Sequence, residues 1–275
     1  MNQVEFNEKA LMLKNLVLDT FEKGKCGHIP SSYSCAEILT MLFYGNIMNF
    51  HPNDPKWDGR DRFVMSKGHA AIIYYSILAD LGFFPKTELD FFSKKGGKVG
   101  VHVHTSVPGI EVNSGSLASG FGVAVGMALA AKLDMKNYLI FALLGDGECY
   151  EGAIWEAANF ASGRNLNNLI TIVDHNHMCC SGFIEDNLGN EPLDEKWRAF
   201  GFDVKTINGH DYNDLTNVFL GIRCRKSKKP LCIIADTVKA NGLASVENTP
   251  LCHNFVPIKP EVMERCRREL NGRDA

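Results

Sequence analysis

Two polar side chains end two successive apolar runs of the chain. Asp146 follows the first run and stands between Gly145 and Gly147, and Asn176 follows the second. If both runs are neighbouring parallel strands, their carboxyl ends meet at the sheet edge where ligands of open α/β folds bind. The two glycines would let a ligand approach the backbone closely, because they carry no side chain.

Carboxylate and amide oxygens are hard ligands, and Mg²⁺ or Ca²⁺ prefers such ligands. A helix expected to begin near Gly152 would direct its N-terminus towards the same edge, and helix N-termini favour phosphate groups. These features together predict a bound diphosphate with a divalent cation. The Gly-Asp-Gly triplet alone also fits a simple strand-ending turn, and the arrival of Asn176 at the next strand end favours the metal site.

The elements that would position these side chains alternate along the chain. Strands are expected at 62–66, 139–144, 169–174 and 230–238. Helices are expected at 6–21, from Ser34 onward, and at 70–83, 117–133, 153–163, 214–224 and 262–270. Apolar strands without polar alternation, separated by helices, are typical of a parallel sheet covered on both faces. The sequence therefore predicts a three-layer α/β fold with a parallel sheet between helices, as a single domain over 1–275.

Two of the helix predictions rest on local patterns. Apolar residues recur at steps of three and four from Phe6 to Phe21, which indicates an amphipathic helix that ends near Gly24. Ser34 and Glu37 have the spacing of a capping box, so the second helix is expected to start there.

Composition excludes some classes of partner and favours one compartment. The 275 residues carry a net charge of −3, which gives no reason to expect binding to nucleic acid or to an anionic membrane. No apolar run is long enough to span a bilayer, and the N-terminus lacks a signal-peptide pattern. The nine cysteines are odd in number and irregularly spaced, so we interpret most of them as reduced thiols. A cytoplasmic protein is expected.

Several separate stretches are similar to one enzyme family, and they appear in that family's order. They are Gly27-His28, SKGHA at 66–70, His102 followed by PGIEVNSGSL at 108–117, GDGECYEGAIWEA at 145–157, the terminal Asn176, and TVKANG with the later His253. Together they resemble transketolase, specifically its N-terminal half that binds the diphosphate of thiamine diphosphate. The resemblance covers nearly the whole chain.

The resemblance implies a cofactor site made of metal ligands and diphosphate contacts. The side chains of Asp146 and Asn176 and the backbone carbonyl of Met178 would ligate Mg²⁺, with Ca²⁺ as an alternative. Gly145, in the same turn as Gly147, is also expected to bind the cofactor. The contacts to the diphosphate itself would come from His69, Gly147 and His253.

The resemblance also implies contacts beyond the diphosphate. Backbone groups of Gly115 and Leu117 would face the aminopyrimidine of the cofactor, and His28 and His102 would face the substrate as catalytic residues, together with His253. Glu151 and Glu156 match acidic positions that link paired active sites, which places Glu151 among the cofactor-binding residues and Glu156 among the catalytic ones. Neutral imidazoles suit donation to hydroxyls and proton transfer near neutral pH.

Five other histidines have no such assignment. A single histidine is more often a structural or surface residue than a catalytic one, and that interpretation is kept for His51, His175, His177 and His210. His104 is left open.

The chain departs from the family pattern near the expected substrate entrance. Ala118-Ser119 stand where the family usually has Gly-Gln, Pro30-Ser31 replace a glycine pair, and Val103 replaces a proline. These changes put the usual sugar-phosphate specificity in doubt more than the cofactor.

In transketolases a second, pyrimidine-binding domain supplies the carboxylate that activates the cofactor. The chain is therefore expected to be one subunit of a split transketolase, in an α2β2 heterotetramer with a C-terminal, pyrimidine-binding partner. Its reaction would be the transfer of a two-carbon ketol unit from a ketose, phosphorylated or otherwise anionic, to an aldose. Two alternatives stay open: the α subunit of another thiamine diphosphate enzyme such as a 2-oxo-acid dehydrogenase, and a non-catalytic cofactor-binding protein.

Overall fold

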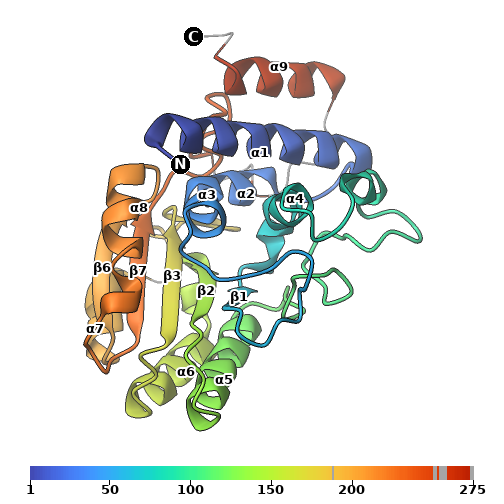
Figure 1. The fold of residues 1–275 in the computed structure, drawn as a ribbon. Helices are drawn as coiled ribbons and strands as arrows, with labels where there is room; N and C mark the ends of the chain where they lie inside the picture. Colours follow the sequence, from blue (N-terminus) through green and yellow to red (C-terminus); the bar gives the residue numbers. More distant parts are fainter. Residues whose placement is uncertain (188, 250–252, 254–258, 273–275) are drawn as a thin grey trace.

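A five-stranded parallel sheet forms the middle layer of the molecule, in the order β1-β2-β3-β7-β6, and helices lie on both of its faces (Figure 1). The computed structural model describes residues 1–187, 189–249, 253 and 259–272. The strands of the sheet are β1 Arg62–Met65, β2 Ile140–Gly145, β3 Leu169–His175, β6 Asp203–Asn208 and β7 Leu231–Asp236. The expected three-layer α/β fold is confirmed.

Each central strand contributes to two hydrophobic cores, because side chains of a strand alternate between the faces of a sheet. On β2, Phe141 and Leu143 belong to one core, and Ala142 and Leu144 belong to the other. The first core includes residues of α1 Gln3–Gly24, α3 Ala36–Tyr44, α4 Ala71–Asp80 and α8 Tyr212–Phe219. The second includes residues of α5 Ser119–Leu133, α6 Gly152–Gly163 and α7 Leu193–Ala199.

The helix expected to begin with a capping box at Ser34 starts elsewhere. The short helix α2 Ile29–Ser34 ends at that residue, and α3 begins at Ala36 with no side-chain cap. The Ser34 hydroxyl donates to Asp174, and the Glu37 carboxylate pairs with Lys14. The capping-box prediction is wrong because both side chains have stronger partners in distant parts of the fold.

Some elements gave no clear signal in the sequence. The edge strand β6 has the mixed pattern DVKTIN, and α2 and α7 are only six and seven residues long. A small antiparallel pair, β4 Met178–Cys179 and β5 Gly182–Phe183, follows the end of β3. The terminal helix α9 Pro260–Leu270 lies on the outer side of α1 (Figure 1). In the described ranges, no helix is long and apolar enough to cross a membrane.

Candidate active site

A cavity of about 460 Å³ lies at the C-terminal edge of the sheet. All but one of the residues predicted for the site line it: His28, His69, His102, Gly115, Leu117, Gly145, Asp146, Gly147, Glu151, Asn176, Met178 and His253. The exception is Glu156, which is exposed on α6 and does not reach the cavity. The fold thus brings together side chains from segments more than 200 residues apart.

Asp146 and Asn176 stand at the ends of β2 and β3, as the two apolar runs predicted. The Asp146 carboxylate accepts the backbone N–H of Gly147 at 2.7 Å and that of His177 at 2.6 Å. The Asn176 side-chain oxygen accepts the Met178 N–H at 3.2 Å. These bonds hold both oxygen-bearing groups beside the Met178 backbone, so the three predicted metal ligands are neighbours.

The turn after Asp146 differs from the expectation in one respect. A short 3-10 helix, Gly147–Tyr150, precedes α6, so the first N–H groups beside the carboxylate belong to that turn. A Cβ atom at Gly147 would lie 2.9 Å from the Cβ of Cys179. Glycine is required there because the turn passes so close to the backbone that follows β3.

The electrostatics of the cavity suit a cation next to an anion. Burial, followed by the negative charge of Asp174, raises the pKa of Asp146 to about 6. A positive charge beside the carboxylate would relieve this cost. The donor set of a carboxylate, an amide oxygen and a backbone carbonyl fits Mg²⁺, which prefers oxygen ligands.

A buried ion pair that the sequence did not reveal lies beside the cavity, and its Lys67 lines the cavity. Lys67, in the SKGHA stretch, donates to Asp174 and to the carbonyl of Ser31. Asp174 also accepts the hydroxyls of Ser34 and Thr237. Burial would lower the pKa of Lys67 and raise that of Asp174, but their mutual attraction outweighs burial and shifts both pKa values the other way. Both groups are therefore charged at neutral pH.

Lys239, in the TVKANG stretch, brings a second positive charge to the cavity. Its Nζ lies 3.4 Å from His253 Nδ1 and 3.5 Å from the Cys179 carbonyl, and no ion pair to it is found within the described ranges. Burial, and then the charge of Lys67, lowers its pKa. An anionic group in the cavity would pair with Lys239, because Lys67 already pairs with Asp174. Both lysines lie inside stretches that carried the family resemblance, which was the available signal for them.

Four histidine rings cluster in the cavity. The His28 ring lies 5.5 Å from His69, 6.0 Å from His102 and 5.3 Å from His253, measured between ring centroids. Burial is the main cause that lowers the pKa of His28 and His253 to about 4, and it holds that of His69 well below its usual range. His28 Nδ1 is buried without a hydrogen-bond partner in the described part of the chain. Neutral imidazoles with an unused ring nitrogen can bind a polar ligand or exchange a proton with it.

Glu148 ties the loop of Gly115 and Leu117 to the Gly-Asp-Gly turn. Its carboxylate accepts the Ala118 N–H at 2.8 Å, the Gly145 N–H at 3.1 Å and the Ser66 hydroxyl at 2.5 Å. Ala118 has a φ of 69°, a conformation that favours glycine, at the position where the resembling family usually has glycine. The anchored backbone explains why alanine keeps this conformation here.

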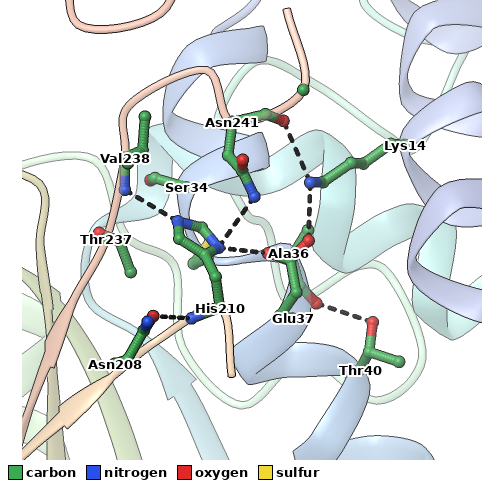
Figure 2. Close-up of polar contacts among 12 residues, drawn as sticks. Lys14, Ser34, Ala36, Glu37, Thr40, Asn208, His210, Thr237, Val238 and Asn241 are labelled. Carbon is green, nitrogen blue, oxygen red and sulfur yellow. Dashed lines mark hydrogen bonds and ion pairs between the residues drawn. The ribbon is translucent and has the colours of Figure 1, made fainter. Parts of the chain in front are cut away.

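His210 holds the loop that carries Lys239, as Figure 2 shows. The Val238 N–H donates to His210 Nε2 at 2.8 Å, so Nδ1 carries the proton and donates to Glu37 at 2.9 Å. Burial would raise the pKa of Glu37, but Lys14, 2.7 Å away, and the bond from His210 lower it to about 2. His210 does not line the cavity, so the structural interpretation of this histidine agrees with its place in the fold.

Comparison with known proteins assigns nearly the whole chain to one family. Residues 7–272 match the family model described as transketolase, thiamine diphosphate binding domain. Among curated proteins, one of the subunits of the apulose-4-phosphate transketolase of Phocaeicola vulgatus is 39% identical over 271 residues, with 98% of this chain and 93% of that protein covered. The 6-deoxy-6-sulfo-D-fructose transketolase subunit SqwG of Clostridium sp. (strain MSTE9) is 38% identical over 254 residues, with 92% of each covered.

Solved structures agree with the fold. The transketolase of Campylobacter jejuni superposes with a TM-score of 0.91 at 33% identity, over 98% of this chain and 43% of that one. The chain thus spans less than half the length of the solved transketolase, while it spans nearly the full length of the two curated subunits.

Proposed function

The chain belongs to the transketolase family, and we propose that it transfers a two-carbon ketol unit from a ketose to an aldose together with a second, pyrimidine-binding subunit. Its likeness to transketolase subunits, along nearly the whole of both chains, supports a two-chain enzyme. The single observation that carries the chemistry is the cavity in which Asp146 and Asn176 stand beside two lysines and four histidines. The predicted family and the thiamine diphosphate-binding domain are confirmed.

The proposed cofactor site divides into a metal part and a diphosphate part. Asp146, Asn176 and the Met178 carbonyl would hold Mg²⁺, since these oxygens are neighbours at the ends of β2 and β3. Lys239 and His253 face the same cavity and would contact the diphosphate oxygens. Gly147 lines this cavity as well, so the backbone of the turn can contact a ligand there.

Thiamine diphosphate, when bound, supplies the reactive carbon that takes up the ketol unit. The chain's own residues would orient the substrate and move its hydroxyl protons. His28 and His102 are placed for this, since both line the cavity and the pKa of His28 keeps that ring neutral. His69, half-buried beside His28, would contact the cofactor.

The donor is proposed to be an anionic ketose. The two curated relatives are named for a sulfonated and a phosphorylated sugar. The departures at Pro30, Val103 and Ala118 each lie next to a residue that lines the cavity, so they are the places where this chain would select a different sugar. A panel of sulfonated and phosphorylated ketoses, offered to the two-subunit enzyme, tests this.

The partner is proposed to bind across α5 and α6. Val123 and Phe160 are each 42% exposed and Leu133 is 72% exposed, which leaves an apolar face on these helices. A Cβ atom at Gly122 or Gly126 would meet no described atom within 4 Å, so another backbone could approach closely there. An α2β2 heterotetramer would let the exposed Glu151 and Glu156 link paired active sites, which is a role for Glu156 away from the cavity. The cytoplasmic location stays a prediction.

Calorimetry with thiamine diphosphate and Mg²⁺ on the two-subunit enzyme tests the cofactor site. Asp146→Ala should weaken binding by more than the roughly 10–100-fold that loss of an outer-shell partner costs. Asp236→Asn, at the end of β7 and outside the cavity, is the matched control and should bind as the wild type does. Unchanged affinity in Asp146→Ala would refute the metal assignment.

The reaction needs its own test. The reconstituted pair should form a ketol-transfer product, and the chain alone should form none. Release of CO₂ from a 2-oxo acid, with no ketol transfer, would instead favour the dehydrogenase alternative. Cofactor binding with no turnover on any ketose would favour the non-catalytic one.

A further inference from the structure

A second cluster of metal-binding side chains lies outside the cavity, at the ends of β3 and β7. His175 Nε2 is 2.8 Å from Glu191 Oε1, and His177 Nε2 is 2.6 Å from Asp236 Oδ1. The two imidazole rings lie 4.1 Å apart between centroids. One ligand atom from each of His175, His177 and Glu191 lies within 4.8 Å of the other two. Only a small rearrangement is needed for three such atoms to share one ion.

The backbone explains why the two rings meet although their residues are two apart. His177 follows the end of β3 with a φ of 61°, so the chain turns sharply after Asn176. The turn brings the ring of His177 over that of His175 instead of leaving it further along an extended strand. Asp236, at the end of the neighbouring strand β7, then accepts a hydrogen bond from His177 and orients its ring.

The donor set differs in kind from that of the diphosphate metal. Two imidazole nitrogens and a carboxylate suit zinc and similar divalent transition metals, whereas Mg²⁺ prefers oxygen alone. A carboxylate that orients a ligating histidine, as Asp236 orients His177, is the usual outer-shell partner of such sites. The chemistry of the side chains therefore selects the class of ion.

The cluster adjoins the proposed cofactor site, since the His177 N–H donates to Asp146, but its side chains lie outside the cavity. Asp174 points to the cavity side of the sheet, and His175, the next residue, points to the opposite face. None of His175, His177, Glu191 and Asp236 lines the cavity. Both histidines are thus unused by the proposed reaction.

We propose that His175, His177 and Glu191 form a binding site for zinc or a similar divalent transition metal, with Asp236 orienting His177. This site is distinct from that of the diphosphate metal and does not depend on the transketolase reaction. Its half-exposed position allows the ion to enter from solvent without unfolding of the chain.

Zinc competition against a chromogenic chelator, with the full chain stripped of metal, tests the proposal. The wild type should bind one equivalent, and His177→Ala should raise the Kd at least about tenfold. His51→Ala is the matched control, because it removes an imidazole that stacks on Trp57 and takes no part in the cluster, and its Kd should stay unchanged. Glu191→Gln provides a second variant in case His177→Ala does not fold, and it should also weaken binding.

A further variant and the spectrum of bound Co²⁺ test which side chains bind the ion. Cys179→Ser should keep the wild-type Kd for zinc, and bound Co²⁺ should show no thiolate charge-transfer band. The proposal is overturned if the wild type binds no zinc or if His177→Ala and Glu191→Gln both bind as tightly as the wild type. It is also overturned if the loss follows Cys179→Ser, because the ion would then sit among the thiols.

Discussion

Asp174 and His175 are consecutive residues that belong to two different ionic clusters. Asp174 faces Lys67 on the cavity side, where the two side chains are 0% and 1% exposed. His175 faces Glu191 on the other side, and its neighbours Glu191, His177 and Asp236 are 42%, 55% and 59% exposed. Two consecutive residues of β3 therefore belong to a fully buried ion pair and to a partly exposed one.

The difference in burial determines what each cluster can do. A buried pair cannot lose one partner without leaving a charge in a medium that solvates it poorly, so Lys67 and Asp174 act as a permanent part of the scaffold. An exposed group contributes little to stability, because water and salt screen it. It can instead exchange its partners, which is the property that a metal site open to solvent requires.

The largest expected effect is on turnover, and it distinguishes the cavity histidines from the residues on the other face of the sheet. His28→Ala and His102→Ala should each lower the turnover of the two-subunit enzyme by roughly 10²–10⁴-fold, the usual contribution of general acid–base groups. Cofactor affinity should change much less. Asp236→Asn, on the exposed side, should turn over like the wild type. Steady-state kinetics and calorimetry check both quantities, and a wild-type kcat/KM in either alanine variant would return that histidine to a structural role.

Removal of one carboxylate from each cluster tests the comparison directly. Asp174→Ala leaves Lys67 charged and buried, so the free energy of unfolding should fall by about 3–5 kcal/mol. Asp236→Ala removes an exposed partner and should cost no more than about 1 kcal/mol. Denaturant unfolding of the full chain measures both. Equal losses would mean that burial does not distinguish the clusters.

A double variant tests whether the unpaired buried charge is what lowers the stability. Replacement of Lys67 by Met and Asp174 by Leu removes both charges, and such exchanges are often neutral or stabilising. The double variant should therefore be more stable than Asp174→Ala alone.

His210 is intermediate in burial between the two clusters. It forms a hydrogen bond with the buried Glu37. His210→Phe leaves the Val238 N–H and one Glu37 oxygen without this partner, and should cost about 1–3 kcal/mol of unfolding free energy. His210→Gln can accept from Val238 and donate to Glu37, so it should recover part of the loss. A loss of equal size in both variants would contradict the hydrogen-bonding role.

A pH dependence of the stability is expected from the cavity side. The pKa of His28 is about 4 in the folded chain and near 6.5 when unfolded, so the unfolded chain binds more protons between these values. Stability should be complete above pH 6.5 and should fall as the pH drops towards 4. His28→Ala should flatten this slope, and Asp236→Asn should not. Unfolding curves at several pH values measure it, and an unchanged slope in His28→Ala would contradict the assignment.

The motif residues could be placed from the sequence because they lie at strand ends. Continuous apolar runs identified β2 and β3, and the parallel sheet then required Asp146 and Asn176 to meet at one edge. The edge strand β6 was not predicted, because its polar alternation resembles a loop. The same local reasoning failed at Ser34, whose capping-box spacing was correct but whose hydroxyl donates to a residue 140 positions away.

The sequence by itself determined the fold class, the family and the glycine, carboxylate and amide groups of the proposed cofactor site. These depend on periodicity and on short motifs, which are local properties of the chain. The tertiary structure alone decided that Lys67 pairs with Asp174, that His210 supports the Lys239 loop, and that His175 and His177 meet Glu191 and Asp236. The physical reason is that charge and burial depend on neighbours brought close by folding. Adjacent residues on one strand face opposite sides of the sheet, so their chemistry follows from the face on which they lie.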